Sequence, residues 1–445
     1  MSPLPDSEGS ADSPSAGDEL PLILHPPPGP VSLSLAESMR RYEAPAINTL
    51  YYDQPSLVWD RALGSNVWDV DGNRYVDLTA GFGVAAIGHR HPQVVAALTA
   101  QSQELIHGLG DVHSHPQRIE LARRLADLAP IENAAVYFSI SGSDAVEIAL
   151  KTAVLATGRA HVLAFSPAYH GLTLGALAAT SRPRFQAPFQ PHLHSLVHRL
   201  PFGCPPAEIE RLLAAHPIAC VLVEPIVGRE GVLLPPPGWL TTLADLSRRA
   251  GALFIVDEVF TGFGRTGSWF AVDHEELRPD LLCCGKALGG GLPIAAVVGN
   301  RGHLQAWPDD GEAIHTATFV ANPLACAASI AALDILQEQQ LPQRAAALGT
   351  IIAERLLPWA EDSTAFPGLT QVRGRGLLWG LEVDHPSRAA AWAQAAMKLG
   401  LLLLAGGAEG RVLQIAPPLV IRSAQLHDAL DRLARAYPRS LKTSA

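Results

Sequence analysis

The sequence predicts an α/β protein with a large domain, built on a mainly parallel sheet that helices cover on both faces, and a smaller α+β domain. Between about residues 134 and 300, short apolar runs alternate with amphipathic helical patterns, which is typical of parallel strands buried on both faces. After about residue 322 the pattern changes to helices followed by strands. The chain has 445 residues, of which 48% are hydrophobic, so it is long enough to bury two such cores.

The strands and helices of the large domain are recognised by their amino-acid composition and by the spacing of their apolar residues. Runs expected to be strands are short, apolar and rich in β-branched residues: 134–139, 162–166, 219–224, 252–257, 281–284 and 295–299. Segments between them that carry helical periodicity are 144–157, 206–215 and 239–250. The regular alternation of the two kinds of segment favours parallel strands joined by crossover helices.

The smaller domain is expected from the helices and strands predicted after about residue 322. Helices are predicted over 323–340, 343–359, 387–399 and 423–437, and strands over 369–372, 377–383 and 412–416. Residues 1–32 are rich in Pro, Ser, Gly and acidic residues, so we expect a tail that is flexible or docked on a partner surface. We predict that 33–75 join the small domain, that 76–330 form the large domain and that 331–445 form the small domain.

Composition excludes several classes of protein. The 33 basic and 43 acidic residues give a net charge of −10 without a basic cluster, which argues against nucleic acid or an anionic membrane as partner. No apolar run is long enough to span a bilayer, and the start of the chain lacks a signal-peptide pattern. The five cysteines show no paired spacing, so they are expected to be buried thiols of a reducing compartment. We therefore expect a soluble cytoplasmic enzyme.

Two charged residues follow neighbouring apolar runs of the predicted sheet. Asp257 ends the run 252–257, and Lys286 follows the run 281–284 within GKALGGGLP. An unpaired buried charge is very costly, and lysine is seldom buried without a role. Together the two residues suit a pyridoxal phosphate site, in which a lysine amine forms a Schiff base and a carboxylate keeps the pyridine nitrogen protonated.

A phosphate cradle is expected between the run 134–139 and the helix that follows it. Ser141, Gly142 and Ser143 precede or open this helix, where free backbone N–H groups and the positive helix end favour an anion. Tyr169 and His170 follow another predicted strand, and the tyrosine ring could stack on a cofactor.

The chain resembles the class III (ω-amino) aminotransferases, which are pyridoxal phosphate enzymes of fold type I. The resemblance covers roughly residues 40 to 440. Its motifs are VWDVDGNRYVDL, GHRHP, SGSDAVEIALK, YHG, VEPI, VDEVFTGFGRTG, GKALGGGLP, TFVANPLACAA and VRGRGLLWGLE, and their order makes the match specific. It implies a seven-stranded sheet and a ping-pong transfer of an amino group from a primary amine or ω-amino acid to a 2-oxo acid.

The resemblance also implies roles for single residues. Lys286 would form the Schiff base and then move the substrate's proton, and Asp257 would pair with the pyridine nitrogen. The residues implied to surround the cofactor are Ser141, Gly142, Ser143, Tyr169, His170, Glu224, Val259 and Thr318. Thr318 would reach across from a neighbouring subunit, because such enzymes are homodimers with shared active sites; a tetramer remains open.

Some positions depart from the family pattern. Gln414 stands where many members have an arginine that binds the substrate's carboxylate, and glutamine cannot form that charged bidentate clamp. Arg229, Arg411 and Arg422 are candidates to replace it. Phe260 stands where a glutamine is frequent. These departures favour an amine donor, or an amino acid bound in an unusual way.

Other functions are compatible with parts of the sequence. An aminomutase or an amino-acid racemase or epimerase would use the same lysine and aspartate. A nicotinamide or flavin oxidoreductase is suggested only by GFGRTG at 262–267, which lies mid-chain and lacks the expected acidic residue downstream. His107, His113 and His115 cluster in sequence, but without a matching carboxylate or cysteine set we expect a polar loop and no metal.

Overall fold

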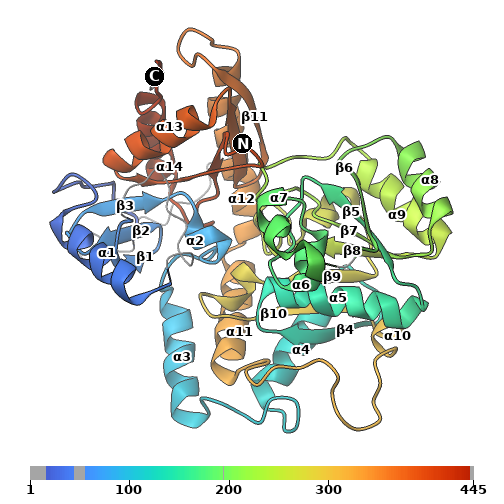
Figure 1. Cartoon of the computed structure of the whole chain (residues 1–445). Coiled ribbons are helices and arrows are strands. Elements are labelled where there is room, and N and C mark those ends of the chain that lie inside the picture. The colour runs from blue at the N-terminus through green and yellow to red at the C-terminus, as the bar shows by residue number, and fades with distance from the viewer. Residues whose placement is uncertain (1–16, 45–55, 194, 441–445) are drawn as a thin grey trace.

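The protein is described here by a computed structural model, which covers residues 17–44, 56–193 and 195–440. Its largest sheet has seven strands in the order β4-β10-β9-β8-β7-β5-β6 (Figure 1). Their bounds are β4 Ala134–Ser139, β5 His161–Ser166, β6 Val197–Pro201, β7 Ile218–Val223, β8 Leu253–Asp257, β9 Leu281–Cys284 and β10 Ala295–Asn300. Only β10 runs antiparallel to its two neighbours. The prediction of a mainly parallel seven-stranded sheet is confirmed.

Both faces of this sheet are buried, as the continuous apolar strands predicted. Along β8, Phe254 and Val256 belong to one apolar cluster, whereas Leu253 and Ile255 belong to another, because successive side chains point to opposite faces. Helix α5 (Gly142–Thr157) covers the face of Leu253 and Ile255. On the other face lie α4 (Pro116–Leu128), α8 (Pro206–Ala215) and α9 (Trp239–Ala250).

Two four-stranded sheets lie outside the large sheet. One has the order β1-β2-β3-β13 and the other β11-β12-β15-β14. Their bounds are β1 Trp59–Leu63, β2 Asn66–Asp69, β3 Arg74–Asp77, β11 Leu369–Arg375, β12 Leu378–Val383, β13 Leu401–Leu402, β14 Leu404–Gly406 and β15 Val412–Ile415. Because β13 pairs with β3 in parallel, the first sheet joins the N-terminal part of the chain to its C-terminal part. The domain boundaries at 32, 75 and 330 stay predictions.

The remaining helices connect and cover these sheets. They are α1 Pro30–Tyr42, α2 Ala80–Gly83, α3 Pro92–Glu104, α6 Leu174–Ala179, α7 Pro183–Gln186, α10 Arg301–Leu304, α11 Pro323–Glu338, α12 Leu341–Leu356, α13 Pro386–Lys398 and α14 Ser423–Arg435, with short 3₁₀ turns η1 Ala187–His192, η2 Ala271–Glu275, η3 Lys286–Gly289 and η4 Leu357–Ala360. None of the helices in the described ranges is both long enough and apolar enough to span a bilayer.

The structure differs from the expected tail over residues 17–32. The buried Asn66 side chain accepts a hydrogen bond from Glu19 N and donates one to Glu19 O, both at 2.9 Å. Leu22 forms a β-bridge with Arg74, and Asp18 forms a 2.6 Å ion pair with Arg422. This part of the segment therefore docks on its own chain through backbone groups, a mode of binding that composition does not reveal. Residues 1–16 of the expected tail lie outside the described residues.

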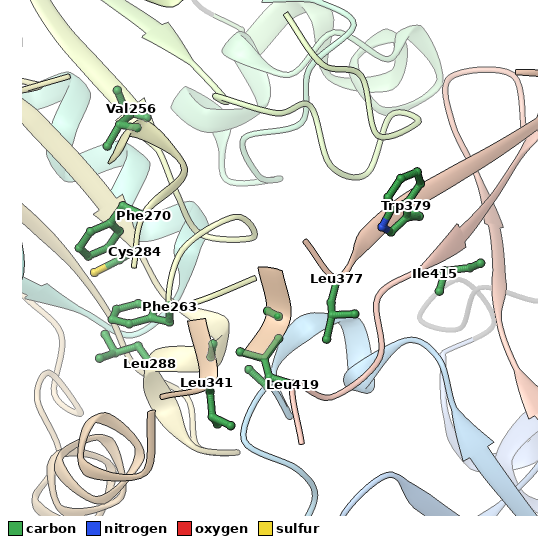
Figure 2. Close-up of a cluster of buried hydrophobic side chains, with 14 of the residues drawn as sticks. Val256, Phe263, Phe270, Cys284, Leu288, Leu341, Leu377, Trp379, Ile415 and Leu419 are labelled. Atoms are coloured by element: carbon green, nitrogen blue, oxygen red, sulfur yellow. The ribbon is translucent and has the colours of Figure 1, made fainter. Parts of the chain in front are cut away.

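A continuous apolar core joins the large sheet to the C-terminal strands (Figure 2). Phe263 and Leu288 on the side of the large sheet lie next to Leu341 and Leu419, with Leu377 beyond them. Arg265 of GFGRTG is buried at this junction and donates hydrogen bonds to Leu377 O (3.1 Å) and Pro417 O (2.5 Å). That segment thus packs the two parts of the chain together.

Candidate active site

A cavity of about 500 Å³ lies at the carboxyl ends of four parallel strands, where ligands bind in open α/β sheets. Strand β5 leads into the loop with Tyr169 and His170, β7 into Glu224, β8 ends at Asp257, and β9 precedes Lys286. The residues that line the cavity are Gly142, Ser143, Tyr169, His170, Gly171, Leu172, Thr173, Glu224, Arg229, Asp257, Val259, Phe260 and Lys286. Most of the residues expected from the sequence are therefore brought together.

Asp257 and His170 form a buried pair in this cavity. The Asp257 Oδ2 and His170 Nδ1 atoms are 2.8 Å apart, and Asp257 Oδ1 accepts a hydrogen bond from Val259 N at 3.1 Å. The two residues are only 5% and 3% exposed. His170 Nε2 is buried and has no hydrogen-bond partner among the described residues. The carboxylate is thus held in one orientation, and a polar nitrogen beside it is left for a ligand.

Lys286 begins the turn η3, with a left-handed φ of 44° directly after Gly285. Burial lowers the pKa of Lys286 to about 8, while Asp257 and Glu224 act in the opposite direction. Its Nζ lies 4.1 Å from the centre of the Phe260 ring. A lysine with a lowered pKa has a larger share of neutral amine at physiological pH, which is the nucleophilic and proton-accepting form.

The Phe260 ring is fixed between two glycines. A Cβ atom at Gly228 would lie 2.2 Å from Phe260, and one at Gly83 would lie 2.6 Å from it. Neither position could carry a side chain without displacing the ring. Phe260 therefore packs closely against both backbones and forms an apolar wall beside the Lys286 amine.

The N-terminus of α5 faces a loop that carries hydroxyl and amide donors. Ser141 caps the helix, its side chain accepting a hydrogen bond from Asp144 N at 3.2 Å. The Ser143 hydroxyl accepts hydrogen bonds from Leu172 N and Thr173 N at 3.1 and 3.0 Å, and lies 2.7 Å from Thr173 Oγ1. First-turn N–H groups have no acceptor within the helix, so the N-terminus of α5, with the Ser143 and Thr173 hydroxyls beside it, is suited to an anion and forms the cradle.

Gly171 allows this close approach. Its φ of 128° is unfavourable for other residues, and a Cβ atom there would lie 2.2 Å from Ser143 Oγ. A side chain at position 171 would push the loop away from α5.

Glu224 is buried beside Asp257 and receives two backbone hydrogen bonds, from Tyr169 N (2.8 Å) and Gly228 N (3.0 Å). Burial raises the pKa of Glu224 to about 7, and the Asp257 charge acts in the same direction, whereas His170 and the two N–H groups oppose it. Its carboxyl group therefore positions the loops of Tyr169 and Gly228 and changes charge near neutral pH.

Of the three arginines proposed to replace the usual carboxylate clamp, only Arg229 lines the cavity. It is exposed, and its guanidinium lies 4.3 Å from the Tyr169 ring centre. Arg411 forms ion pairs with Glu382 and Glu409. Arg422 pairs with Asp18. Gln414 Nε2 instead donates a 3.2 Å hydrogen bond to Gly228 O, which fixes the loop that carries Arg229.

Two expected residues do not line the cavity. Ser141 acts as the cap of α5. Thr318 is exposed in the segment before α11, where its carbonyl lies close to Gly110. Sequence reasoning missed Leu172 and Thr173 as lining residues. These two residues lie between YHG and the first residue of helix α6, and this position in the sequence could have indicated them.

Comparison with known proteins is consistent with this geometry. The sequence profile described as aminotransferase class-III matches residues 49–437. The chain is 42% identical over 378 residues to the acetylornithine aminotransferase of Methanopyrus kandleri, covering 85% of this chain and 93% of that protein. It is 38% identical to the acetylornithine aminotransferase of Mycobacterium leprae over 91% of this chain and 96% of that one.

Solved structures agree. The ornithine aminotransferase of Toxoplasma gondii superposes with a TM-score of 0.84 at 31% identity, covering 91% of this chain and 94% of that one. An aminotransferase of Bacillus anthracis superposes with a TM-score of 0.85 at 27% identity, over 91% and 98% of the two chains.

The chain belongs to the class-III aminotransferase family. It is a pyridoxal phosphate-dependent aminotransferase with the fold of the type I enzymes, as the sequence motifs predicted. The oxidoreductase alternative is thereby set aside.

The cavity of this aminotransferase fits that cofactor. The cradle of α5, Ser143 and the 171–173 loop is suited to a phosphate. The buried Asp257 carboxylate is suited to a ring nitrogen, and Lys286 is a half-buried amine with a lowered pKa. The buried, unpartnered His170 Nε2 is a further polar atom that a ligand can satisfy.

Replacing Gly171 by Ala tests the phosphate cradle. The new Cβ atom would collide with Ser143 Oγ, so we expect the dissociation constant for pyridoxal phosphate to rise at least tenfold. A tenfold change corresponds roughly to the loss of one charge-assisted hydrogen bond. The measurement is a cofactor titration followed by absorbance. Gly158→Ala is the matched control, because Gly158 also has a positive φ but nothing lies within 4 Å of its Cβ position. Equal affinities of the two variants would contradict the cradle.

Glu224→Gln tests the raised pKa. The pKa of Glu224 is about 7 in the folded protein and about 4.5 in the unfolded chain. Between these two pH values the folded state therefore binds one proton that the unfolded state has lost. The contribution of Glu224 to the free energy of unfolding therefore falls as pH rises from 4.5 to 7. We expect the free energy of unfolding of the variant to increase relative to that of wild type as the pH is raised from 5.5 to 7.5. The measurement is urea unfolding of the holoenzyme. A difference that does not depend on pH would refute this.

Proposed function

We propose that this aminotransferase transfers the amino group of an ω-amino acid or primary amine to a 2-oxo acid in a ping-pong cycle centred on Lys286. The convergence of Lys286, Asp257 and the α5 cradle in one cavity carries the proposal. Its relatives are named for acetylornithine and ornithine, which are ω-amino acids, and this supports the donor class.

The roles of the residues follow from their positions. Pyridoxal phosphate, when bound, supplies an aldehyde that takes up amines and a ring that accepts electrons. Asp257, oriented by His170 and Val259 N, would hold the ring nitrogen of the cofactor in its protonated form. Lys286, half-buried and with its pKa lowered to about 8, would take a proton from the donor carbon and deliver it to the cofactor carbon that carried the aldehyde. Phe260 excludes water beside the lysine amine.

Arg229 is proposed as the cation that binds the carboxylate of donor or acceptor. It is an exposed arginine on the cavity wall, and the Tyr169 ring holds its guanidinium in place at 4.3 Å. Gln414, at the family's usual arginine position, is neutral and supports the loop of Arg229 through Gly228 O. The carboxylate site is thus shifted from position 414 to position 229.

We also propose a cytoplasmic homodimer in which Thr318 completes the partner's cavity. Thr318 is exposed and lies outside the cavity of its own chain. It is in a region with a group of exposed apolar side chains, comprising Ile106, Leu109, Val112, Ile314 and Phe319. Large exposed apolar groups of this kind mark surfaces that another chain covers.

The proposed function is tested by the absorbance spectrum of the purified protein with pyridoxal phosphate, before and after donors are added without an acceptor. We expect a cofactor band that ω-amino acids or amines convert, and that a 2-oxo acid restores. Lys286→Ala should retain the fold and bound cofactor but lose turnover. A band that no donor converts, together with interconversion of amino-acid enantiomers, would identify a racemase instead. Absence of any band would overturn the assignment of the site.

Arg229→Gln tests the carboxylate site. We expect the KM for an ω-amino acid to rise about tenfold to a hundredfold, the range of a charge-assisted arginine–carboxylate contact, whereas the KM for an amine without carboxylate stays unchanged. The donor half-reaction is measured alone, so that the acceptor's carboxylate does not contribute. Arg411→Gln is the control, because Arg411 is paired with Glu382 and Glu409. An equal increase in KM for the ω-amino acid and for the amine without carboxylate would show that Arg229 has a structural role only.

A further inference from the structure

Three histidines that are distant in sequence converge at the edge of the large sheet. They are His161, His198 and His216, and one ring nitrogen from each lies within 4.8 Å of the others. His161 Nδ1 and His198 Nε2 are 2.8 Å apart. The rings of His198 and His216 are stacked with their centres 4.0 Å apart, and those of His161 and His216 are 5.5 Å apart. All three residues are half-buried, so the ring nitrogens are confined but can be reached from solvent.

The fold itself brings these residues together. His161 is the first residue of β5, and His198 in β6 is paired with Leu163 of β5. Because alternate residues of a strand share a face, His161, Leu163 and His198 lie on the same face of the sheet. His216 is the C-cap of α8, which packs on this face with α9. The end of α8 carries partial negative charge, which favours a cation at this position.

We propose that His161, His198 and His216 bind a divalent transition-metal ion, with Zn²⁺ as the ion that fits best. Three imidazoles and one open position are a frequent ligand set of zinc, and imidazole nitrogens suit Zn²⁺ over Mg²⁺ or Ca²⁺. Zinc–nitrogen bonds of about 2.0–2.1 Å in tetrahedral geometry require ligand atoms about 3.3 Å apart. One pair of nitrogens is 2.8 Å apart and all three lie within 4.8 Å of one another, so binding the ion would require the side chains to rotate toward this value.

The site lies at the opposite end of β5 from the active site. His161 begins the strand, whereas Tyr169 and His170 follow its last residue, Ser166. The metal would therefore link the edge strand β6, the strand β5 and the end of α8, and act on stability without taking part in amino transfer. The three histidines are 37 and 18 residues apart and lack the close spacing of a metal motif, so the site is not recognisable from the sequence.

The experiment is zinc binding to the metal-stripped holoenzyme, measured by competition with a chromophoric zinc chelator and by the shift in Tm. We expect one Zn²⁺ per chain with a Kd below about 1 µM and, at a hundredfold excess over Kd, a rise in Tm of about 3 °C. His198→Gln should lose both effects while keeping amino transfer unchanged. His427→Asn is the matched control, because His427 is exposed on α14 and lies outside the cluster.

A second readout separates loss of a ligand from loss of fold. Co²⁺ added to wild type should give visible absorption of a four-coordinate site, which His161→Gln and His216→Gln should each remove while the cofactor spectrum stays unchanged. Zinc binding that persists in all three variants, or a wild-type Kd above about 100 µM, would overturn the proposal. The cluster would then be a hydrogen-bonded and stacked histidine group without a metal.

Discussion

The burial of charge at the carboxyl end of the large sheet is the constraint on which the site depends. Asp257, Glu224 and Lys286 sit at the ends of adjacent strands, where water that would stabilise their charges is largely excluded. The two carboxylates are therefore supported by groups that the loops supply. His170 and Val259 N hold Asp257, and Tyr169 N and Gly228 N hold Glu224. The loops that provide these groups are the same loops that form the cavity walls.

This mutual support explains why one cavity contains most of the residues needed for the chemistry. The loop that Glu224 fixes carries Tyr169, and Tyr169 in turn supports Arg229. The neighbouring residues 171–173 reach the α5 cradle through Ser143. These positions are thus linked to one another by hydrogen bonds and ring contacts.

Much of the fold could be predicted from sequence because its signals are local. Strands such as β7 and β8 are continuous apolar runs, and helices such as α8 and α9 have the bounds that their periodicity gave. Asp257 and Lys286 were found because charged residues at the ends of apolar strands are rare. The family motifs then supplied residues such as Val259 and Glu224, which no pattern of charge or period singles out.

What the sequence did not reveal depends on contacts between distant segments. The docking of residues 17–32 rests on the buried amide of Asn66, and the position of Arg229 rests on the loop around Gly228. Arg265 looked like part of a nucleotide motif, but its contacts with Leu377 and Pro417 lie more than a hundred residues away. Side-chain partners of this kind are set by the folded arrangement and leave no periodic trace.

The pairing of β3 with β13 has a consequence for synthesis of the chain. Val76 and its partner Leu401 are 325 residues apart (401 − 76), so one edge of the N-terminal sheet has no partner strand until almost the whole polypeptide has been made. At about 5–20 residues per second, this interval lasts roughly 16 to 65 s on the ribosome. The large parallel sheet, whose strands all lie between these two, can form first. The N-terminal sheet can be completed only after the large sheet, when β13 has been synthesised.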